Sequence, residues 1–229
     1  MAERKKENRV CENLNFASKE AFKRLRNNIE SAFAADGKKC PVIGITSAQP
    51  SEGKSTVAIN LAYTLSEHGH RVILIDADLR RSSVHTKLGM RKAPGLSNLL
   101  IELGEISTCI QTYKSSKGST SFAVLTSGEA PENPSELLDS LTMDKVLGIL
   151  SEHYDYIILD LPPVGAVVDA VSIAPSIDGM LVVIRENNCS RSVLSDCVDQ
   201  LEYAKANILG FVMNGALEGA GKRYQYSYY

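Results

Sequence analysis

A glycine, a lysine and a serine follow one another at Gly53, Lys54 and Ser55, a few residues after an apolar run that ends at Thr46. They match the end of the phosphate-binding pattern G-x-x-x-x-G-K-[ST], whose first glycine is replaced here by Ala48. The glycine lets backbone N–H groups turn toward phosphates, the lysine supplies a cation to the β- and γ-phosphates, and the serine hydroxyl binds Mg²⁺. We expect Ala48 at the strand exit, farther from the phosphates, where a methyl group fits. The chemistry indicated is the binding of a nucleoside triphosphate.

Three carboxylates end two further apolar runs. Asp76 and Asp78 follow one run, and Asp160 ends another, directly before Leu-Pro-Pro. An acid at the end of a buried strand is the Walker B arrangement, in which the carboxylate orients Mg²⁺ directly or through water. Each acid taken alone could be an ordinary strand-end or loop carboxylate. Together with the glycine–lysine–serine segment they predict a phosphoryl-transfer site at the carboxyl ends of strands, where α/β sheets bind ligands.

The elements that must position these residues alternate between strand and helix. Continuous apolar runs, typical of buried parallel strands, occupy 41–46, 70–76, 122–125, 156–160, 180–184 and 208–213. Helical patterns occupy 18–34, with Ser18 as the expected N-cap, and then 54–67, 135–153, 169–176 and 190–205. This alternation predicts an α/β fold with a mostly parallel sheet and helices on both faces. We expect 1–229 to form one domain, with a leader at 1–17 and a flexible surface loop at 115–120.

The composition excludes several classes of protein. With 44% hydrophobic and 23% charged residues the chain is typical of a globular domain, and its net charge of -2 argues against nucleic-acid binding. Its five cysteines are scattered and odd in number, which fits reduced thiols better than disulfides. No apolar run approaches the ~20 residues that span a membrane, and the first residues do not form a secretory signal. We therefore expect a cytoplasmic protein that reaches a membrane only through a partner.

Tyrosine is concentrated at the end of the chain. Four of the nine tyrosines lie among the last six residues, at Tyr224, Tyr226, Tyr228 and Tyr229. A packed core would spread its aromatic side chains through the fold, whereas chain termini are the segments least often ordered. A phenol outside the core can enter an active site and accept a phosphoryl group. We therefore expect 222–229 to be a flexible tail that carries the phosphoacceptors.

Together these segments resemble the bacterial tyrosine kinases (BY-kinases) of capsular and exopolysaccharide biosynthesis, in particular their stand-alone cytoplasmic type. Residues 48–55 resemble the family's Walker A motif, 73–80 its additional Walker A′ motif and 157–163 its Walker B motif. The related partition ATPases carry a second lysine where this chain has Gln49, which favours the kinase branch. The resemblance implies a P-loop kinase that phosphorylates its own tail, between subunits, to regulate polysaccharide synthesis and export.

The motifs and the resemblance together assign roles to individual residues. The expected catalytic residues are Lys54, Asp76 and Asp78, with Asp76 as the first choice to orient or deprotonate the incoming phenol and Asp78 able to exchange roles with it. Mg²⁺ is expected at Ser55, Asp78 and Asp160. ATP is expected to be bound by Gln49, Pro50, Ser51, Glu52, Gly53, Lys54, Ser55, Thr56 and, at the adenine edge, Asn214. Arg80 and Arg81 are expected to hold the incoming acceptor or a neighbouring subunit.

The resemblance also implies partners. Family members assemble rings through an E-x-x-R-x-x-R pattern, which here reads Glu20, Lys23 and Arg26; Lys23 keeps the charge of the first arginine and loses its fork of donors. The implied partners are other copies of the chain, a transmembrane activator or polysaccharide co-polymerase that supplies a cytoplasmic activating segment, and a tyrosine phosphatase. The alternative function is a P-loop ATPase switch that organises a membrane assembly and leaves tyrosines unmodified.

Overall fold

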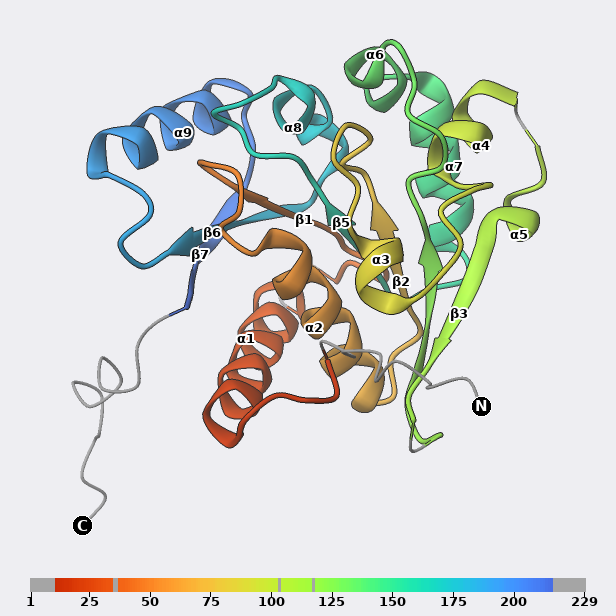
Figure 1. Ribbon diagram of the computed structural model, residues 1–229, viewed down its shortest axis with the longest axis horizontal. Helices are drawn as coiled ribbons and strands as arrows, with labels where there is room; N and C mark the ends of the chain where they lie inside the picture. Colours follow the sequence, from red (N-terminus) through yellow and green to blue (C-terminus); the bar gives the residue numbers. More distant parts are fainter. Residues whose placement is uncertain (1–10, 35–36, 103, 117, 216–229) are drawn as a thin grey trace, which may run out of the picture.

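The computed structural model describes residues 11–34, 37–102, 104–116 and 118–215. The tyrosine tail and most of the expected leader lie outside the described residues. Within the described part, one sheet has the strand order β3-β4-β2-β5-β1-β6-β7 (Figure 1). All neighbouring strands are parallel except β3 and β4, which are antiparallel. The strands are β1 Val42–Ser47, β2 Val72–Asp76, β3 Ile110–Lys114, β4 Ser121–Leu125, β5 Tyr156–Asp160, β6 Gly179–Arg185 and β7 Ile208–Asn214.

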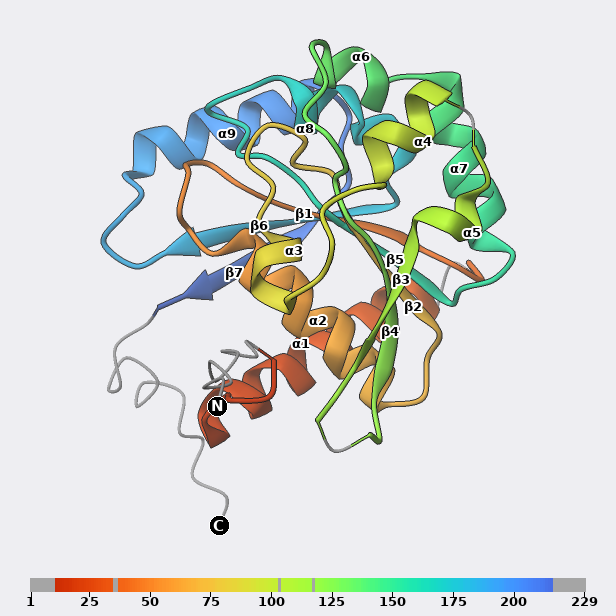
Figure 2. The same cartoon turned by 45° about the vertical axis from the view of Figure 1, so that its right-hand side comes forward.

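Helices cover both faces of the sheet, as the alternation of apolar runs predicts (Figures 1 and 2). One face carries α1 Phe16–Ala34, α2 Lys54–Glu67 and α3 Val84–Leu88. The other face carries α4 Leu96–Glu102, α5 Ile106–Cys109, α6 Pro134–Leu138, α7 Leu141–Ser151, α8 Asp169–Ser172, the 3₁₀ turn Ala174–Ser176 and α9 Arg191–Tyr203. The expected α/β P-loop fold with a mostly parallel sheet is confirmed.

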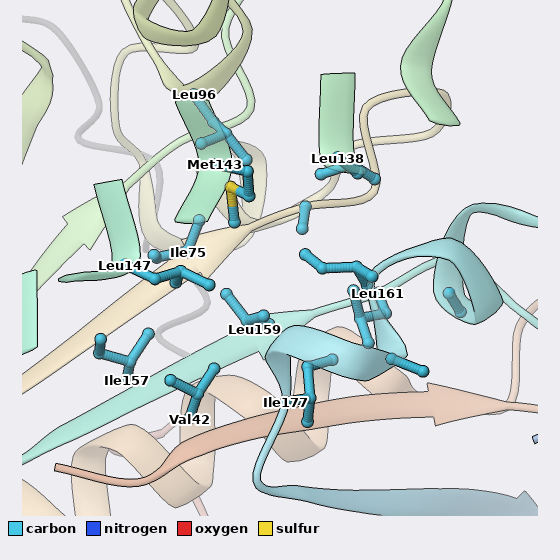
Figure 3. Close-up of a cluster of buried hydrophobic side chains, with 14 of the residues drawn as sticks. Val42, Ile75, Leu96, Leu138, Met143, Leu147, Ile157, Leu159, Leu161 and Ile177 are labelled. Carbon is cyan, nitrogen blue, oxygen red and sulfur yellow. The ribbon is translucent and has the colours of Figure 1, made fainter. Parts of the chain in front are cut away.

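Successive residues of the central strands alternate between two apolar layers. On β5, Ile157 and Leu159 pack into the layer under α7, whereas Ile158 packs into the layer under α2. Figure 3 shows Ile157 and Leu159 beside Leu147 and Ile75 in the first of these layers. Because both faces are buried, these strands need apolar residues at every position, which explains their continuous apolar runs.

Three expectations about the elements are wrong. Helix α1 begins at Phe16, and its cap is Asn15, whose Oδ1 accepts the N–H of Ser18 at 2.8 Å. The expected helix at 135–153 is two helices, because Ser140 caps α7 by accepting the N–H of Met143. The expected helix at 169–176 is the short helix α8 followed by the 3₁₀ turn Ala174–Ser176.

Candidate active site

A cleft of about 880 Å³ lies at the carboxyl ends of the parallel strands. Its walls come from the loops that follow β1, β2 and β5 and from the ends of β6 and β7. Five segments that are distant in sequence meet here because parallel strands place their carboxyl ends at one edge of a sheet. The cleft is lined by Pro50, Ser51, Gly53, Lys54, Ser55, Thr56, Asp78, Arg80, Arg81, Ser83, Lys87, Pro162, Pro163, Ala166, Val167, Arg185, Asn214 and Gly215.

The phosphate-binding loop joins β1 to α2, and Gly53 caps that helix with φ +99°. A side chain at Gly53 would be strained at this angle, and its Cβ would lie 1.9 Å from Nδ2 of Asn214. Ala48 needs no such freedom, because its φ is not positive and its methyl group is buried in the core. The structure thereby explains why alanine is tolerated at the first glycine position of the pattern, whereas the second glycine position, Gly53, requires glycine.

Two of the residues expected to bind nucleotide do not line the cleft: Gln49 and Glu52. The carboxylate of Glu52 is fully buried and accepts the N–H of Gln49 at 3.0 Å and that of Arg185 at 3.4 Å. Asn214 lines the cleft, and its Nδ2 donates to the carbonyl of Glu52 at 2.8 Å. Glu52 therefore fixes the shape of the loop with its side chain, and Asn214 ties the end of β7 to the same loop.

Lys54 is a nearly buried cation, with 8% of its surface exposed. Among the described residues it has no hydrogen-bond or ion-pair partner, although it lies close enough to Asp160 to lower the pKa of that carboxyl. An ammonium group with three donors and no protein acceptor is costly to bury unless a ligand completes it. Ser55, the next residue, accepts a hydrogen bond from the Oγ of Ser83 at 2.8 Å.

The carboxylates Asp76 and Asp160 lie side by side, at paired positions on β2 and β5. Both side chains are fully buried. Oδ2 of Asp76 accepts the N–H of Val84 at 3.1 Å, whereas Oδ1 of Asp76 and both oxygens of Asp160 have no hydrogen-bond partner in the described part of the chain.

Burial shifts the pKa of both carboxyls upward. Burial, with the nearby charge of Asp160 as the second cause, raises the pKa of Asp76 well above its ordinary value. Burial raises the pKa of Asp160 to about 7, against the opposing effects of Ser55 and Lys54. Two adjacent buried carboxylates with so few hydrogen-bond donors are expected to share a proton unless a cation joins them.

Of the two expected bases, only Asp78 lines the cleft. Its Oδ1 accepts the N–H of Arg81 at 2.9 Å, and 7% of its surface is exposed. Asp76 lies behind it, fully buried. Position therefore favours Asp78 over the first choice from the sequence, Asp76, because Asp78 has access to the cleft whereas Asp76 is buried beside Asp160.

Oδ1 of Asp76, both oxygens of Asp160 and the ammonium of Lys54 lack partners among the described residues. They fit a ligand that brings phosphate groups to the lysine and a cation to the carboxylates. The described residues contain no group of three His, Cys, Asp or Glu side chains able to hold a metal. A Mg²⁺ ion held at Ser55, Asp78 and Asp160 would therefore complete its shell with phosphate oxygens and water, as Mg²⁺ does in phosphoryl-transfer sites.

The cleft also contains residues that the motifs do not indicate. Lys87 and Arg185 line it, from α3 and from the end of β6. Arg80 is expected to hold the incoming phosphoryl acceptor, but two of its N–H groups already donate to Asp169. Only the remaining N–H groups of its guanidinium can contact a ligand. No sequence signal joins Arg80 to Asp169, since they lie 89 residues apart.

The residues expected to support ring assembly lie on α1. The ammonium of Lys23 pairs with Glu20 at 2.8 Å on the exposed side of the helix, and Nε of Arg26 lies 3.7 Å from Glu30. These contacts are within the helix, so the role of Glu20, Lys23 and Arg26 in assembly stays a prediction. Of the described helices, none combines the length and the apolar character needed to cross a membrane.

A strand, a phosphate-binding loop and a helix, with acids at the ends of neighbouring strands, define a P-loop nucleotide-binding protein. The family model described as "AAA domain" matches residues 40–210. The chain is 36% identical over 210 residues to tyrosine-protein kinase YwqD of Bacillus subtilis, covering 92% of this chain and 85% of the relative. It is 32% identical over 216 residues to tyrosine-protein kinase CpsD of Streptococcus agalactiae, covering 93% and 90%.

Solved structures give the same result. The kinase domain of Escherichia coli tyrosine kinase ETK matches with a TM-score of 0.83 and 33% identity, covering 96% of this chain and 84% of that domain structure. The chain spans only 28% of the length of the Escherichia coli K12 kinase etk itself. The chain belongs to the bacterial tyrosine kinases, which transfer a phosphoryl group from ATP to protein tyrosine.

Proposed function

We propose that this chain is an autokinase that phosphorylates its own tail at Tyr224, Tyr226, Tyr228 and Tyr229. The observation that carries the proposal is the cleft in which the unpaired ammonium of Lys54 lies near the buried carboxylates of Asp160 and Asp76, three of whose four oxygens have no hydrogen-bond partner among the described residues. Such a site binds phosphates on one side and a cation on the other. A phenol is the acceptor that needs the least help, since its pKa of ~10 lies far below that of an aliphatic alcohol.

Lys54 and the backbone N–H groups of the loop bind the phosphates and stabilise the charge that spreads over the transferred group. Ser55, Asp78 and Asp160 hold Mg²⁺, which when bound neutralises charge between the β- and γ-phosphates. Asp78 orients or deprotonates the phenol from its position on the cleft wall, with Asp76 as the alternative base. Asn214, which lines the cleft, contacts the adenine edge in this proposal.

The tail is attached close to the site. Strand β7 ends at Asn214, and both Asn214 and Gly215 line the cleft. Strand β7 is parallel to β6 and therefore ends at the same edge of the sheet as the phosphate-binding loop. Tyr224 lies nine positions after Gly215 in the chain, a separation that spans at most about 30 Å. Transfer between subunits is therefore proposed on the family resemblance and needs a direct test.

Two variants, one without activity and one without acceptors, test transfer between subunits. One is Lys54→Met with its tail intact, and the other is an active kinase whose four tail tyrosines are changed to phenylalanine. After mixing with Mg·ATP, phosphate on the Lys54→Met tail supports transfer between subunits. If that tail gains none while the unmixed wild type modifies itself, the acceptor and the active site belong to one subunit.

A P-loop ATPase switch that leaves tyrosines unmodified is the competing function. Intact-mass measurement after incubation with Mg·ATP separates the two, with and without a peptide from the cytoplasmic segment of a membrane activator. Phosphate additions confined to 224–229 support the autokinase. ATP hydrolysis without added mass, under both conditions, supports the switch.

The charge added by phosphorylation of the tail suggests how the kinase is regulated. Each phosphotyrosine adds roughly -1.5 to -2 charges, so several in six residues repel one another strongly. We propose that this repulsion loosens the ring, that a phosphatase reverses it, and that the cycle regulates synthesis and export of a polysaccharide at the membrane through a co-polymerase partner. The cleft itself does not repel a phosphorylated tail by charge, because the side chains that line it include five cations, at Lys54, Arg80, Arg81, Lys87 and Arg185.

A further inference from the structure

One cation of the cleft wall is held by a buried carboxylate. Nε of Arg80 donates to Oδ2 of Asp169 at 2.9 Å, and Nη2 donates to Oδ1 at 3.1 Å. Asp169 is fully buried, whereas 41% of the Arg80 side chain is exposed. This two-point contact uses one edge of the planar guanidinium and fixes its orientation, which a single hydrogen bond would not do.

The other edge of Arg80 remains available. A guanidinium has five N–H donors, and within the described part of the chain only the two to Asp169 are used. Arg80 lines the cleft, two residues after Asp78 in the loop that follows β2. Asp169 begins α8, directly after the segment 162–167, several of whose residues line the cleft. The pair therefore joins two walls of the cleft and holds donors on its surface.

We propose that Arg80 is a catalytic residue whose free N–H donors bind the phosphoryl group during its transfer, and that Asp169 is the positioning residue that holds it there. This inference rests on the kinase activity of the chain and adds a second cation to Lys54. In the step, the phenolic oxygen bonds to the γ-phosphorus, the bond from that phosphorus to the β–γ bridging oxygen breaks, ADP leaves, and the phenol proton passes to a carboxylate. Negative charge moves onto the transferred oxygens, where an oriented guanidinium stabilises it.

A purely structural role, in which the pair only fastens α8 to the loop after β2, makes different predictions. In that case, substitutions at Arg80 or Asp169 would lower the stability of the fold, and kcat and ATP affinity would fall together. The chain offers a matched control in Arg71 and Asp155, a second two-point arginine–aspartate pair that does not line the cleft. Arg71→Lys removes the same two-point guanidinium contact at a position away from the cleft, where it can affect only the stability of the fold.

The experiment compares Arg80→Lys, Asp169→Asn, the double variant and Arg71→Lys. For each we would measure the initial rate of phosphorylation at saturating Mg·ATP, the ATP dissociation constant by calorimetry and the thermal unfolding midpoint. We expect Arg80→Lys to lower kcat about 100-fold, as removal of an oriented donor does, with less than about a 3-fold change in ATP affinity. Asp169→Asn is expected to lower kcat about 10-fold, as loss of a supporting group does. The double variant should be no slower than Arg80→Lys, since Asp169 acts only through Arg80.

Several results would overturn the inference. They are a kcat in Arg80→Lys within 3-fold of the wild type, an effect of Asp169→Asn that persists in full beside Arg80→Lys, or a loss of ATP affinity that accounts for the whole defect. Loss of folded protein in all Arg80 and Asp169 variants, with Arg71→Lys unaffected, would assign the pair to stability alone. If the wild type hydrolyses ATP without modifying tyrosine, the autokinase proposal fails, while the rate of ATP cleavage still tests Arg80.

Discussion

Replacing Asp160 with asparagine is expected to stabilise the protein at neutral pH while it removes activity. The side chain is fully buried, and neither of its oxygens has a hydrogen-bond partner among the described residues. In the absence of Mg²⁺ its ionised form is therefore poorly stabilised, and burial raises its pKa to about 7. Asparagine has nearly the same shape and carries no charge, so it removes the cost of ionisation and leaves the packing intact.

The sign and size of the effect follow from proton linkage. Between the ordinary pKa of 3.8 and the raised pKa of about 7 the folded protein binds more protons than the unfolded chain. Stability contributed by the protonated carboxyl is present at low pH and is lost as pH rises through this window. Since one pKa unit corresponds to about 1.36 kcal/mol, the loss at pH 8 is about 4 kcal/mol. Asp160→Asn should recover about that amount at pH 8 and almost none at pH 4.

Urea denaturation, followed by circular dichroism in EDTA and without nucleotide, measures this directly at pH 4, 6 and 8. Asp199→Asn, which changes an exposed carboxylate on α9, is the control and should alter the free energy of unfolding by less than about 0.5 kcal/mol. If Asp160→Asn is less stable than the wild type at pH 8, or its advantage does not shrink toward pH 4, then the buried carboxyl is stabilised by contacts that the structure does not contain and the reasoning fails.

Three further outcomes are expected. Lys54→Met should abolish tyrosine phosphorylation by intact mass without lowering the free energy of unfolding in urea, because it removes a nearly buried cation that has no partner among the described residues. Gly53→Ala should abolish ATP binding by calorimetry and destabilise the fold by about 1–3 kcal/mol, since a Cβ at φ +99° would lie 1.9 Å from Asn214; retained binding would contradict this. Lys23→Arg restores the fork of the expected assembly pattern and should raise the fraction of oligomer in light scattering at equal protein concentration, whereas an unchanged fraction would exclude Lys23 as the weak point.

The sequence predicts the parts of this molecule that depend on local pattern. Helix α2 begins at Lys54 and ends at Glu67 as expected, because the loop pattern fixes its first residue and its apolar positions continue to a polar break. The same holds for the acids at the ends of β2 and β5, since a buried strand must be apolar until it reaches the edge of the sheet. Strand β3 is not predicted because it is an edge strand of five residues, only one of which is buried, and it has no continuous apolar run.

The sequence does not reveal which side chains contact each other when they are far apart along the chain. Glu52 is indistinguishable by pattern from a residue that contacts nucleotide, yet its carboxylate is buried and fixes the loop through backbone N–H groups. The pairing of Arg80 with Asp169 depends on how α8 packs over the sheet, which no local motif encodes. The sequence therefore locates the cleft, and the structure is needed to separate residues that contact the ligand from residues that hold them in place.

The position of Gly215 bears on the proposed transfer between subunits. Because β7 ends at the cleft, the first proposed acceptor, Tyr224, lies nine positions along the chain from a residue that lines its own subunit's cleft. A random-coil segment of that length has a root-mean-square span of about 17 Å, which corresponds to a local concentration in the millimolar range. Proximity of this kind favours transfer within one subunit. Transfer between subunits would require contacts that hold a neighbour's cleft closer to the tail, and we propose that α1, where Lys23 departs from the expected pattern, supplies them.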